Sequence, residues 1–345
     1  MPIKVLVVDD SALVRKLLTE VINRESDMIV VGSARDPYEA RDKIKELCPD
    51  VLTLDVEMPR MDGLTFLGNL MRLRPMPVVM VSSLTARGAE VTLAALEAGA
   101  IDFVTKPQIG VEEGLAGLAR ELCDKLRAAA TANVRAPRDA LGVPRTAPVK
   151  STKLSTTDRV IAIGASTGGT EAVATILLQL PPDAPAIVIT QHIPELFSAR
   201  FAKRLDDECQ IRVCEAQGDE QLLLGHAYVA RGGHHLRVKR SGAKYFCAVS
   251  QDEPVNRHRP SVHVLFESVA LEVGHNAIGV ILTGMGDDGA QGLKLMRETG
   301  SHTLAQDKAT SVVWGMPGEA VKCGAASEVL PLGRIASRLL ELSKR

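Results

Sequence analysis

Three reactive side chains in the second half of the chain each follow the pattern of a buried strand. Ser166 comes directly after VIAIGA, His192 directly after AIVITQ, and Asp287 and Asp288 close the segment AIGVILTGMGDD. A hydroxyl, an imidazole and a carboxylate that meet in space can carry out acyl transfer, because the imidazole deprotonates the hydroxyl and the carboxylate stabilises the imidazolium. Histidine, with an ordinary pKa near ~6.5, is the natural base for a serine at neutral pH. The pattern therefore predicts a serine hydrolase site.

The elements that must position these side chains are the strands of a parallel sheet. Open α/β sheets bind ligands in the crevice beyond the carboxyl ends of their strands. Ser166 and His192 stand at that end of their predicted strands, and Asp288 follows its strand within a glycine-rich turn. Loops at this edge can meet although they lie far apart in the sequence, so we expect the three side chains to converge within hydrogen-bonding reach.

The Ser166 segment is open to three interpretations. In ASTGG a strand and a turn precede a helix, which exposes the hydroxyl beside free N–H groups that can stabilise an oxyanion. Ser166 or Thr167 can instead cap that helix, and a glycine loop at a helix start can also bind a phosphate group. The segment does not match the G-x-S-x-G turn of α/β-hydrolases, because Thr167 and Gly168 follow the serine.

The base and the acid also have alternatives. A histidine after a strand can be a loop residue with one hydrogen bond, although His192 is the one that directly ends a continuous apolar run. The other histidines are His226, His234, His235, His258, His263, His275 and His302. His234, His235, His258 and His263 could suggest a metal site, but no matching Cys or carboxylate spacing supports one. Either Asp287 or Asp288 can cap the following helix, and the sequence does not decide which.

Composition limits the class of protein. A chain of 345 residues with 46% apolar residues favours two packed domains. The formal net charge of −1 favours neither nucleic acid nor an anionic membrane as a partner. No apolar run reaches the ~20 residues that span a bilayer, and the N-terminus does not have the pattern of a signal peptide. The six scattered cysteines, with no C-x-x-C pair, indicate reduced thiols in a cytoplasmic protein.

The order of elements predicts an α/β protein with two doubly wound parallel-sheet domains. Residues 1–128 alternate apolar strand patterns with helix-length segments, and parallel strands need such crossover helices. Residues 129–157 mix Ala, Pro, Arg, Thr and Ser without periodicity, which is typical of a flexible linker. The strand–helix alternation resumes after the linker, and we expect residues 158–345 to form the catalytic domain with alternation continuing to the C-terminus.

The first domain carries a second group of reactive residues at predicted strand ends. Asp9 and Asp10 follow the first strand, Asp55 ends the third, and Ser82 and Lys106 stand at the ends of later strands. Carboxylates this close repel one another unless a cation lies between them, and a set of oxygen ligands suits Mg²⁺. The alternative for the paired aspartates alone is a cap on the next helix.

Residues 3–128 resemble a response-regulator receiver domain. The motifs that carry the resemblance are VVDDS, LDVEMPRMDG, MVSS and VTKP, in that order. The resemblance implies a flavodoxin-like fold in which Asp55 accepts a phosphoryl group from a histidine kinase. It also implies that Asp10, Asp55 and the Glu57 carbonyl bind Mg²⁺ with Asp9 assisting through water. The switch positions that it implies are Ser82, Phe103 and Lys106.

Residues 158–345 resemble the protein-glutamate methylesterase domain of the CheB family. The matching motifs are IAIGASTGGTEA, ITQHIPELF, GHAYVA, NRHRPSV, GVILTGMGDDGA and GMPGEA. The resemblance implies a Rossmann-like α/β domain that needs no cofactor, with Ser166 as nucleophile, His192 as base and Asp288 as acid. Backbone N–H groups at the start of the Ser166 helix, at Thr167, and at Met285 would hold the oxyanion.

Two features of this domain stay open at the level of sequence. Family members often have Asn where Asp287 stands, so this chain places a second carboxylate beside the predicted triad. The basic stretch Arg257, His258 and Arg259 can face the substrate or form a solvated loop.

The two resemblances together imply a phosphorylation-activated enzyme of chemotactic adaptation. It would hydrolyse glutamate γ-methyl esters on the cytoplasmic helices of chemoreceptors, release methanol and also deamidate receptor glutamines. A chemotaxis histidine kinase would be the phosphodonor. Two alternatives belong to other classes: a phosphorylation-controlled binding module in which the glycine loops cradle an anion, and a DNA-binding response regulator, which the near-neutral charge and the absence of a helix-turn-helix pattern disfavour.

Overall fold

A computed structural model describes residues 1–83, 85–106, 112–134 and 159–344 of the chain. It divides the chain into two compact units, Met1–Val143 and Pro144–Arg345. The last helix of the first unit continues to Ala130, two residues past the predicted limit of the receiver domain. Residues 135–158, most of the predicted linker, lie outside the described residues. Within the described ranges, none of the helices combines the length and the apolarity that crossing a bilayer requires.

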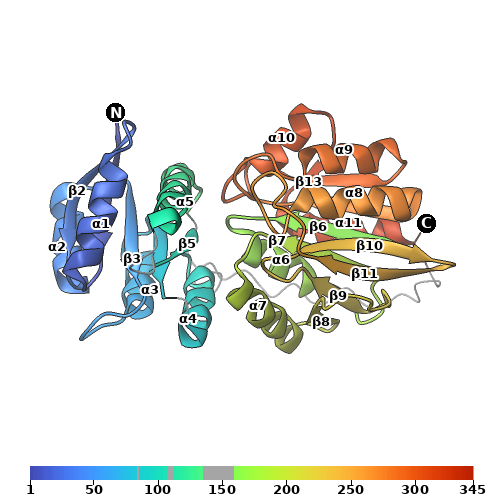
Figure 1. Ribbon diagram of the computed structural model, residues 1–345, viewed down its shortest axis with the longest axis horizontal. Coiled ribbons are helices and arrows are strands. Elements are labelled where there is room, and N and C mark those ends of the chain that lie inside the picture. The colour runs from blue at the N-terminus through green and yellow to red at the C-terminus, as the bar shows by residue number, and fades with distance from the viewer. Residues whose placement is uncertain (84, 107–111, 135–158, 345) are drawn as a thin grey trace. The chain divides into compact units, whose positions relative to one another are not determined.

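The first unit is built on a five-stranded sheet in the order β2-β1-β3-β4-β5, with parallel pairing throughout. This is the order of the flavodoxin-like fold that the resemblance to a receiver domain implies, and its switch point lies between β1 and β3. The strands are β1 (Ile3–Val8), β2 (Met28–Ala34), β3 (Val51–Asp55), β4 (Val78–Ser82) and β5 (Asp102–Thr105). The helices between and after them are α1 (Ala12–Asn23), α2 (Pro37–Leu47), α3 (Gly63–Leu73), α4 (Ala86–Glu97) and α5 (Glu112–Ala130) (Figure 1).

The second unit contains a seven-stranded parallel sheet in the order β14-β13-β12-β6-β7-β9-β8. Its strands are β6 (Val160–Ala165), β7 (Ala186–Gln191), β8 (Arg212–Glu215), β9 (His226–Val229), β12 (Ala277–Ile281), β13 (His302–Gln306) and β14 (Glu328–Leu330). The strand β6 lies between β7 and β12, so the three segments predicted to carry the reactive residues are neighbours in the sheet. Every residue of β6, β7 and β12 is buried, because parallel sheets are covered on both faces.

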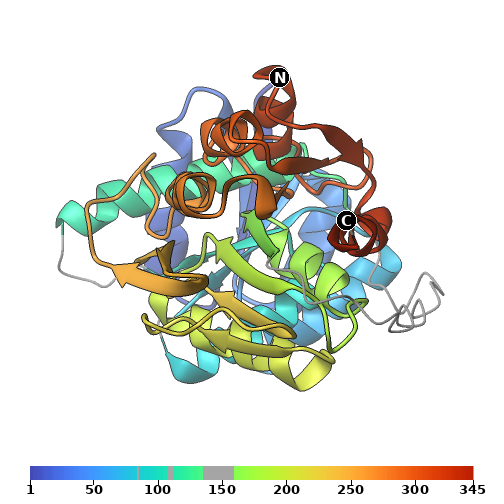
Figure 2. The ribbon, with the colours of Figure 1, turned by 90° about the vertical axis from the view of Figure 1, so that its right-hand side faces the viewer.

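Helices cover this sheet in two groups. The helices are α6 (Gly169–Leu177), α7 (Glu195–Glu208), α8 (Val262–Glu272), α9 (Ala290–Glu298), α10 (Met316–Lys322) and α11 (Leu332–Ser343), with a 3₁₀ turn at Gly274–Asn276. The helix α9 contacts both α8 and α10, whereas α6 contacts α7 and α11 (Figure 2). The doubly wound arrangement of the sheet is therefore confirmed.

The predicted alternation is wrong between residues 212 and 250. No helix separates β8, β9, β10 (His235–Ser241) and β11 (Lys244–Ser250), and β10 and β11 pair as an antiparallel hairpin outside the main sheet. The sequence analysis missed this run of strands because a strand pattern by itself fits both a parallel strand followed by a helix and an antiparallel hairpin. The hairpin packs on α8 rather than extending the sheet.

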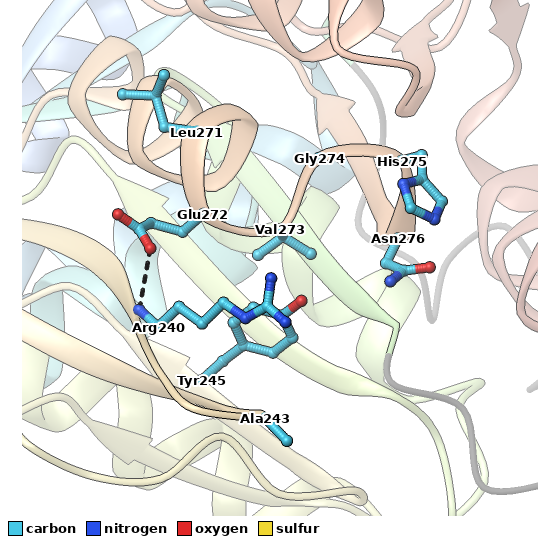
Figure 3. A pocket seen from close by; sticks show the side chains of 9 residues that line it. All are labelled: Arg240, Ala243, Tyr245, Leu271, Glu272, Val273, Gly274, His275 and Asn276. Carbon is cyan, nitrogen blue, oxygen red and sulfur yellow. Dashed lines mark hydrogen bonds between the residues drawn. The ribbon is translucent and has the colours of Figure 1, made fainter.

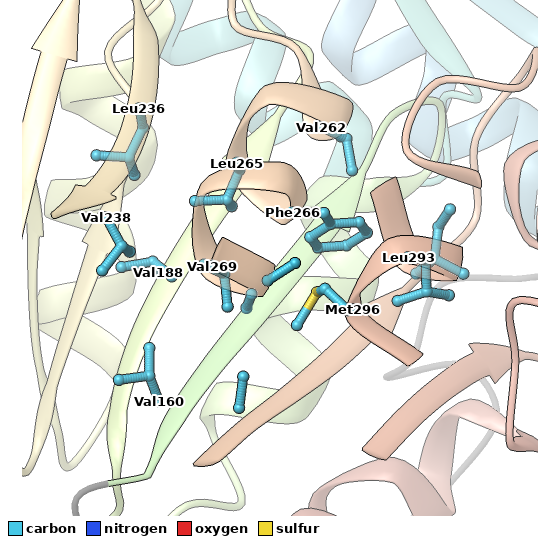
Figure 4. Packing of buried hydrophobic residues seen from close by; sticks show 14 of the residues in the cluster. Val160, Val188, Leu236, Val238, Val262, Leu265, Phe266, Val269, Leu293 and Met296 are labelled. Atoms are coloured by element: carbon cyan, nitrogen blue, oxygen red, sulfur yellow. The ribbon is translucent and has the colours of Figure 1, made fainter. Parts of the chain in front are cut away.

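The helix α8 is held in place by apolar contacts on two sides. Figure 4 shows Val262, Leu265, Phe266 and Val269 of α8 among apolar side chains of the hairpin, the sheet and α9. Gly164 of β6 lets the helix start approach the sheet, because a Cβ there would lie 2.1 Å from Val262 Cγ1. This packing brings the N-terminus of α8 to the edge of the sheet at which Ser166 stands.

Candidate active site

Three side chains from separate sheet segments form one hydrogen-bonded line. The Oγ of Ser166 lies 3.1 Å from Nδ1 of His192, and Nε2 of that ring lies 2.9 Å from Oδ2 of Asp288. Ser166 directly follows β6, His192 directly follows β7, and Asp288 lies beyond the end of β12. The structure thus brings together the three residues that the sequence singles out, at the carboxyl edge of the parallel strands. The order of hydroxyl, imidazole and carboxylate is that of a nucleophile, a base and an orienting acid.

The imidazole of His192 presents its two nitrogens in a definite direction. Nδ1, next to the Cβ, faces the Ser166 hydroxyl, and the more distant Nε2 reaches the Asp288 carboxylate. For the ring to accept a proton from Ser166, its own proton must stand on Nε2 and be donated to Asp288. The side chain of His192 is only 9% exposed, so little solvent competes for either nitrogen.

The carboxylate of Asp288 is buried and accepts hydrogen bonds from four further donors. They are Asn256 Nδ2 at 2.8 Å, Ser261 Oγ at 2.9 Å, the Val262 N–H at 2.7 Å and the His263 N–H at 3.3 Å. Burial by itself would raise the pKa of Asp288, but the hydrogen bond and charge of His192, with the bonds from Asn256 and Val262, outweigh burial and hold the pKa well below its usual range. The group is therefore a carboxylate at neutral pH.

Neither Asp287 nor Asp288 caps α9, the helix that follows them. The N-cap of α9 is Gly289, whose φ is 87°, and no side chain caps that helix. Asp288 instead accepts the first N–H groups of α8, a helix that begins 26 residues earlier in the chain. Asp287 is exposed, and its carbonyl accepts the N–H of Ala290. The positive end of the α8 dipole adds to the stabilisation of the Asp288 charge.

Asn256 and Ser261 are functional residues that the sequence reasoning did not identify. Both lie in the NRHRPSV segment, which carries part of the family resemblance and a basic stretch but gave neither residue a role. Their partner is 32 residues away for Asn256 and 27 for Ser261. A serine directly before a helix is the usual sign of an N-cap, yet Ser261 makes no side-chain cap bond to α8 and donates to Asp288 instead. The serine before the helix was therefore an ambiguous signal, because the sequence could not distinguish a helix cap from a donor to Asp288.

The three basic residues of this segment have separate positions. The ring of His258 stacks on the ring of His192, with centroids 3.8 Å apart and planes 12° from parallel. Arg259 Nη1 donates to the carbonyls of Gln251 and Asp252, so Arg259 holds its own loop. Arg257 is exposed and has a φ of 68°.

The turn after β6 leaves the Ser166 hydroxyl uncommitted to the helix. The N-cap of α6 is Gly168, with a φ of 74°, and no side chain caps α6, so neither Ser166 nor Thr167 is the cap. The N–H of Ser166 donates to the Thr283 carbonyl at 3.0 Å, which removes it from the possible oxyanion donors. Thr167 is buried, and its carbonyl accepts the Thr283 hydroxyl.

Met285 lies in the turn beside the nucleophile. A Cβ on Gly284 would lie 2.8 Å from Ser166 Cβ, which shows how closely the 284–286 turn approaches Ser166. The next residue, Gly286, has a φ of 81°, a conformation that L side chains rarely adopt. Met285 lies between Gly284 and Gly286, and its backbone therefore lies close to Ser166.

The first unit assembles the predicted acidic cluster. Potential ligand atoms of Asp9, Asp10 and Asp55 all lie within 4.8 Å of one another; Asp9 and Asp55 are buried and Asp10 is exposed. The cap of α1 is Ser11, which accepts the Val14 N–H, so the aspartates are not needed for that role. Within the described residues this is the one cluster of its kind, and no histidine cluster with metal-ligand spacing occurs among them.

Lys106 links two of these carboxylates. Its Nζ lies 3.0 Å from Asp9 Oδ2 and 2.8 Å from Asp55 Oδ2. Burial raises the pKa of Asp55 to about 6, with the neighbouring Asp9 charge acting in the same direction and the hydrogen bond and charge of Lys106 opposing them. The site thus holds two buried negative charges against one ammonium group.

The remaining predicted residues of the first unit are Glu57, Ser82 and Phe103, and each has its own contacts. The Glu57 N–H donates to Asp55 Oδ1 at 3.3 Å. The Ser82 hydroxyl accepts from Thr92 Oγ1 at 2.8 Å, and Ser82 is buried. Phe103 is also buried, and Lys125 Nζ lies 5.1 Å from its ring centroid.

A surface hollow at the C-terminal end of α8 is separate from these sites. Figure 3 shows its lining, in which the Arg240 N–H donates to Glu272 Oε2 at 3.2 Å. The Arg240 guanidinium lies 6.0 Å from the centroid of Tyr245. No residue of the Ser166–His192–Asp288 line belongs to this hollow, so it is not the place of the predicted chemistry.

Comparison with known proteins identifies the family to which each unit is similar. The family model described as CheB methylesterase matches residues 161–339, and the one described as response regulator receiver domain matches residues 5–115. Protein-glutamate methylesterase/protein-glutamine glutaminase 1 of Xanthomonas euvesicatoria pv. vesicatoria is 58% identical over 350 residues, which cover 99% of this chain and 98% of that protein. The corresponding protein 2 of Cupriavidus pinatubonensis is 58% identical over 339 residues, covering 98% of this chain and 95% of that protein.

A solved structure agrees with these relatives. The crystal structure of the Thermotoga maritima CheB methylesterase catalytic domain aligns with a TM-score of 0.52 and 37% identity, over 53% of this chain and 98% of that chain. The second unit therefore resembles a solved CheB methylesterase catalytic domain in fold as well as in sequence. The chain belongs to the CheB methylesterase family and carries a response regulator receiver domain ahead of its methylesterase domain.

Proposed function

We propose that this protein hydrolyses γ-glutamyl methyl esters on chemoreceptors, releasing methanol, and deamidates receptor glutamines by the same chemistry. The observation that carries the proposal is the hydrogen-bonded line from Ser166 through His192 to Asp288. The printed names of full-length relatives, protein-glutamate methylesterase/protein-glutamine glutaminase, supply the substrate class. Both reactions transfer the same acyl group, and they differ only in whether methanol or ammonia leaves.

The first half of the mechanism follows from the direction of the His192 ring. Nδ1 takes the proton of the Ser166 hydroxyl as Oγ attacks the γ-carbonyl carbon of the substrate. The imidazolium formed keeps its Nε2 proton in a hydrogen bond to Asp288, whose negative charge stabilises the cation and is itself held by four other donors. Nδ1 then gives the proton taken from Ser166 to the methoxy oxygen or the amide nitrogen as its bond to the acyl carbon breaks, so that methanol or ammonia leaves and an acyl-enzyme on Ser166 remains.

The oxyanion and the second half of the reaction use the backbone around the nucleophile. We assign the oxyanion to the N–H groups of Thr167 and Met285, because the Ser166 N–H is already bonded to the Thr283 carbonyl. Water then attacks the acyl-enzyme with His192 again as base, and the product carboxylate is released. Donors of this kind are worth about 10²–10³ in turnover each.

The receiver domain is the proposed control element. Asp55 would accept a phosphoryl group from a chemotaxis histidine kinase, and Mg²⁺ supplies charge neutralisation for that transfer when it is bound. Asp10, Asp55 and the Glu57 carbonyl would hold the ion, with Asp9 assisting through water. The donor set fits, because three carboxylates within 4.8 Å offer the hard oxygen ligands that Mg²⁺ prefers.

The chain's own switch residues would respond to the new group. A phosphoryl group adds roughly −1.5 to −2 charge at Asp55 and offers acceptors that compete for nearby donors. Lys106, now shared between Asp9 and Asp55, would turn to the phosphoryl oxygens, and the Ser82 hydroxyl would leave its present Thr92 contact. Phe103 would change its packing in the same step.

One assay tests the proposal as a whole. Methanol release is measured from methylated receptor membranes with the wild-type chain and with Ser166→Ala, each with and without a small-molecule phosphodonor. Loss of the nucleophile should lower turnover by about 10⁴-fold or more, and the phosphodonor should raise only wild-type turnover. Equal methanol release by the two proteins would exclude the hydrolase and favour a binding module instead.

A further inference from the structure

The catalytic base is covered on one face by a second histidine. The rings of His192 and His258 lie 3.8 Å apart at 12°. His258 forms no part of the line of hydrogen bonds that the mechanism uses, yet its ring stacks on the ring that moves the proton. We infer that His258 is a positioning residue for His192: its ring holds the base in the rotamer that points Nδ1 at Ser166.

The orientation of His192 makes such a contact necessary. A half-turn of the ring about Cβ–Cγ would put carbon atoms where Nδ1 and Nε2 now stand. Both hydrogen bonds, to Ser166 Oγ and to Asp288 Oδ2, would be lost at once. The terminal torsion of histidine is broad and roughly two-fold, so the side chain has little intrinsic preference for the productive state. Rotation sweeps the ring edge out of its plane, and the stacked ring of His258 occupies that space.

The segment that carries His258 is itself tied to the acid. Asn256 and Ser261, on either side of His258 in the chain, both donate to Asp288 Oδ1. One short segment therefore fixes the carboxylate with its polar side chains and the imidazole with its aromatic ring. Any shift of the segment would move the acid and the ring contact together.

A tight turn sets the direction of the His258 side chain. The N–H of His258 donates to the Val255 carbonyl at 3.0 Å, and the Val255 N–H donates to the His258 carbonyl at 3.1 Å. Between them, Asn256 and Arg257 have φ values of 51° and 68°. Positive φ at both central residues is the pattern of a two-residue reverse turn, and an L side chain such as that of arginine adopts it only at an energetic cost. The hydrogen bond from the Asn256 side chain to Asp288 ties this turn to the acid.

The experiment compares two substitutions that distinguish the flat shape of the His258 ring from its ability to titrate and to donate a proton. His258→Ala removes the stacked ring, and His258→Phe keeps a flat ring that can neither titrate nor donate a proton. If His258 positions the base, the Ala variant should lose about 10–100-fold in kcat, the range expected for misplacing a reacting group by about 1 Å, with KM changed less than about 2-fold. The Phe variant should stay within about 3-fold of wild type. His258→Asn serves as a second variant without the ring if the Ala variant folds poorly, and it should lose as much.

A spectroscopic readout follows the base itself. The proton between His192 Nε2 and Asp288 should give a resolved low-field NMR signal in the wild-type chain. We expect that signal to persist in His258→Phe and to broaden or vanish in His258→Ala, because a ring that rotates breaks the bond. A merely structural role of His258 would change the thermal midpoint without this pattern.

The inference rests on the proposed serine chemistry, and a substrate-independent reaction keeps the two apart. A fluorophosphonate probe labels an activated serine whatever its natural ester, so labelling of Ser166 is timed in all variants. An unlabelled wild-type chain would reject the proposed function. A labelled wild type with His258→Ala labelled just as fast, or with His258→Phe as slow as His258→Ala, would overturn the positioning role.

The matched control removes an imidazole elsewhere in the same unit. His275 is exposed in the 3₁₀ turn after α8, and His275→Ala should leave labelling, kcat and the low-field signal unchanged. Trp314, the one tryptophan of the chain, lies in the catalytic unit and reports whether each variant is folded.

Discussion

The hydroxyl of Thr283 donates to the carbonyl of Thr167 at 3.0 Å and so ties the end of β12 to the turn that presents the nucleophile. The same residue accepts the Ser166 N–H at its own carbonyl, also at 3.0 Å. Its hydroxyl further accepts the Val313 N–H at 3.0 Å. Thr283 is 1% exposed, so water does not replace these bonds. The position of Ser166 therefore depends on a residue 117 positions later, which no local pattern indicates.

Thr283→Val should weaken both the fold and the reaction. The substitution keeps the shape of the side chain but removes the hydroxyl that bonds the Thr167 carbonyl and the Val313 N–H. We expect a loss of about 1–3 kcal/mol in the free energy of unfolding, measured by urea titration followed through Trp314 fluorescence. The kcat should fall by about 10-fold or more, because the nucleophile turn loses an anchor.

A control for this change is Thr299→Val. The Thr299 hydroxyl, at the exposed C-terminal end of α9, donates to the carbonyls of Leu295 at 3.2 Å and Met296 at 2.9 Å. Its loss should change the unfolding free energy by less than about 0.5 kcal/mol and leave turnover intact. Equal effects of the two substitutions would show that the Thr283 hydroxyl has no special part in placing Ser166.

Gly284→Ala should displace the nucleophile directly. The added Cβ would lie 2.8 Å from Ser166 Cβ and 2.3 Å from Met316 Sδ. Overpacking of this kind costs about 1–3 kcal/mol, and a shift of Ser166 by about 1 Å should lower kcat by about 10²-fold. Methanol release and the thermal midpoint are measured together. Turnover near that of wild type would mean that the Met316 side chain gives way and Ser166 does not move.

The comparison variant is Gly333→Ala, in the first turn of α11, where an added Cβ would meet open space. Replacing glycine by alanine in a helix should be neutral or add about 0.5–1 kcal/mol of stability. Turnover should not change.

Asp288→Asn should alter the pH dependence of stability with a definite sign. The pKa of Asp288 is lowered by folding, so its ionised form contributes stability that is fully present above the unfolded pKa of about 3.9 and is lost as the pH falls below it. The wild-type chain should therefore exceed the variant by about 1–3 kcal/mol near pH 7, and the gap should narrow below about pH 4. Urea unfolding at several pH values, read by Trp314, measures the gap.

The same substitution should reduce turnover by about 10⁴-fold, because an amide at this position favours the wrong tautomer of the His192 ring. A gap in stability that widens on acidification would contradict the assignment of Asp288 as an ionised, hydrogen-bonded acid.

Removal of divalent cations should abolish activation by phosphorylation and leave basal catalysis intact. With EDTA present, a small-molecule phosphodonor should no longer raise methanol release, because Asp9, Asp10 and Asp55 then lack the ion that offsets their charge. Basal turnover should stay within about 2-fold, since Ser166, His192 and Asp288 need no metal in the proposed mechanism. Asp55→Asn should reproduce the EDTA result in the presence of Mg²⁺. Basal activity that disappears with the metal would place an ion in the catalytic unit.

Much of the fold could be read from local patterns. The apolar runs that became β6, β7 and β12 are continuous because parallel strands are buried on both faces, and this made them visible in the sequence. The strand order of the first unit is the flavodoxin-like one that the resemblance to a receiver domain implies, which local patterns do not specify. The hairpin of β10 and β11 was missed, because whether a strand joins a parallel sheet or turns back on its neighbour depends on what packs against it.

The sequence by itself determined which side chains could act: a hydroxyl, an imidazole and a carboxylate, each placed after a buried strand, where parallel strands bring chain ends together. The tertiary structure alone decided what holds them. Asn256 and Ser261 reach Asp288, Thr283 anchors the Ser166 turn, and His258 covers the base, each across a long stretch of chain. The physical reason is that hydrogen bonds and ring contacts act over a few ångströms in space, whereas patterns in a sequence report only neighbours along the chain.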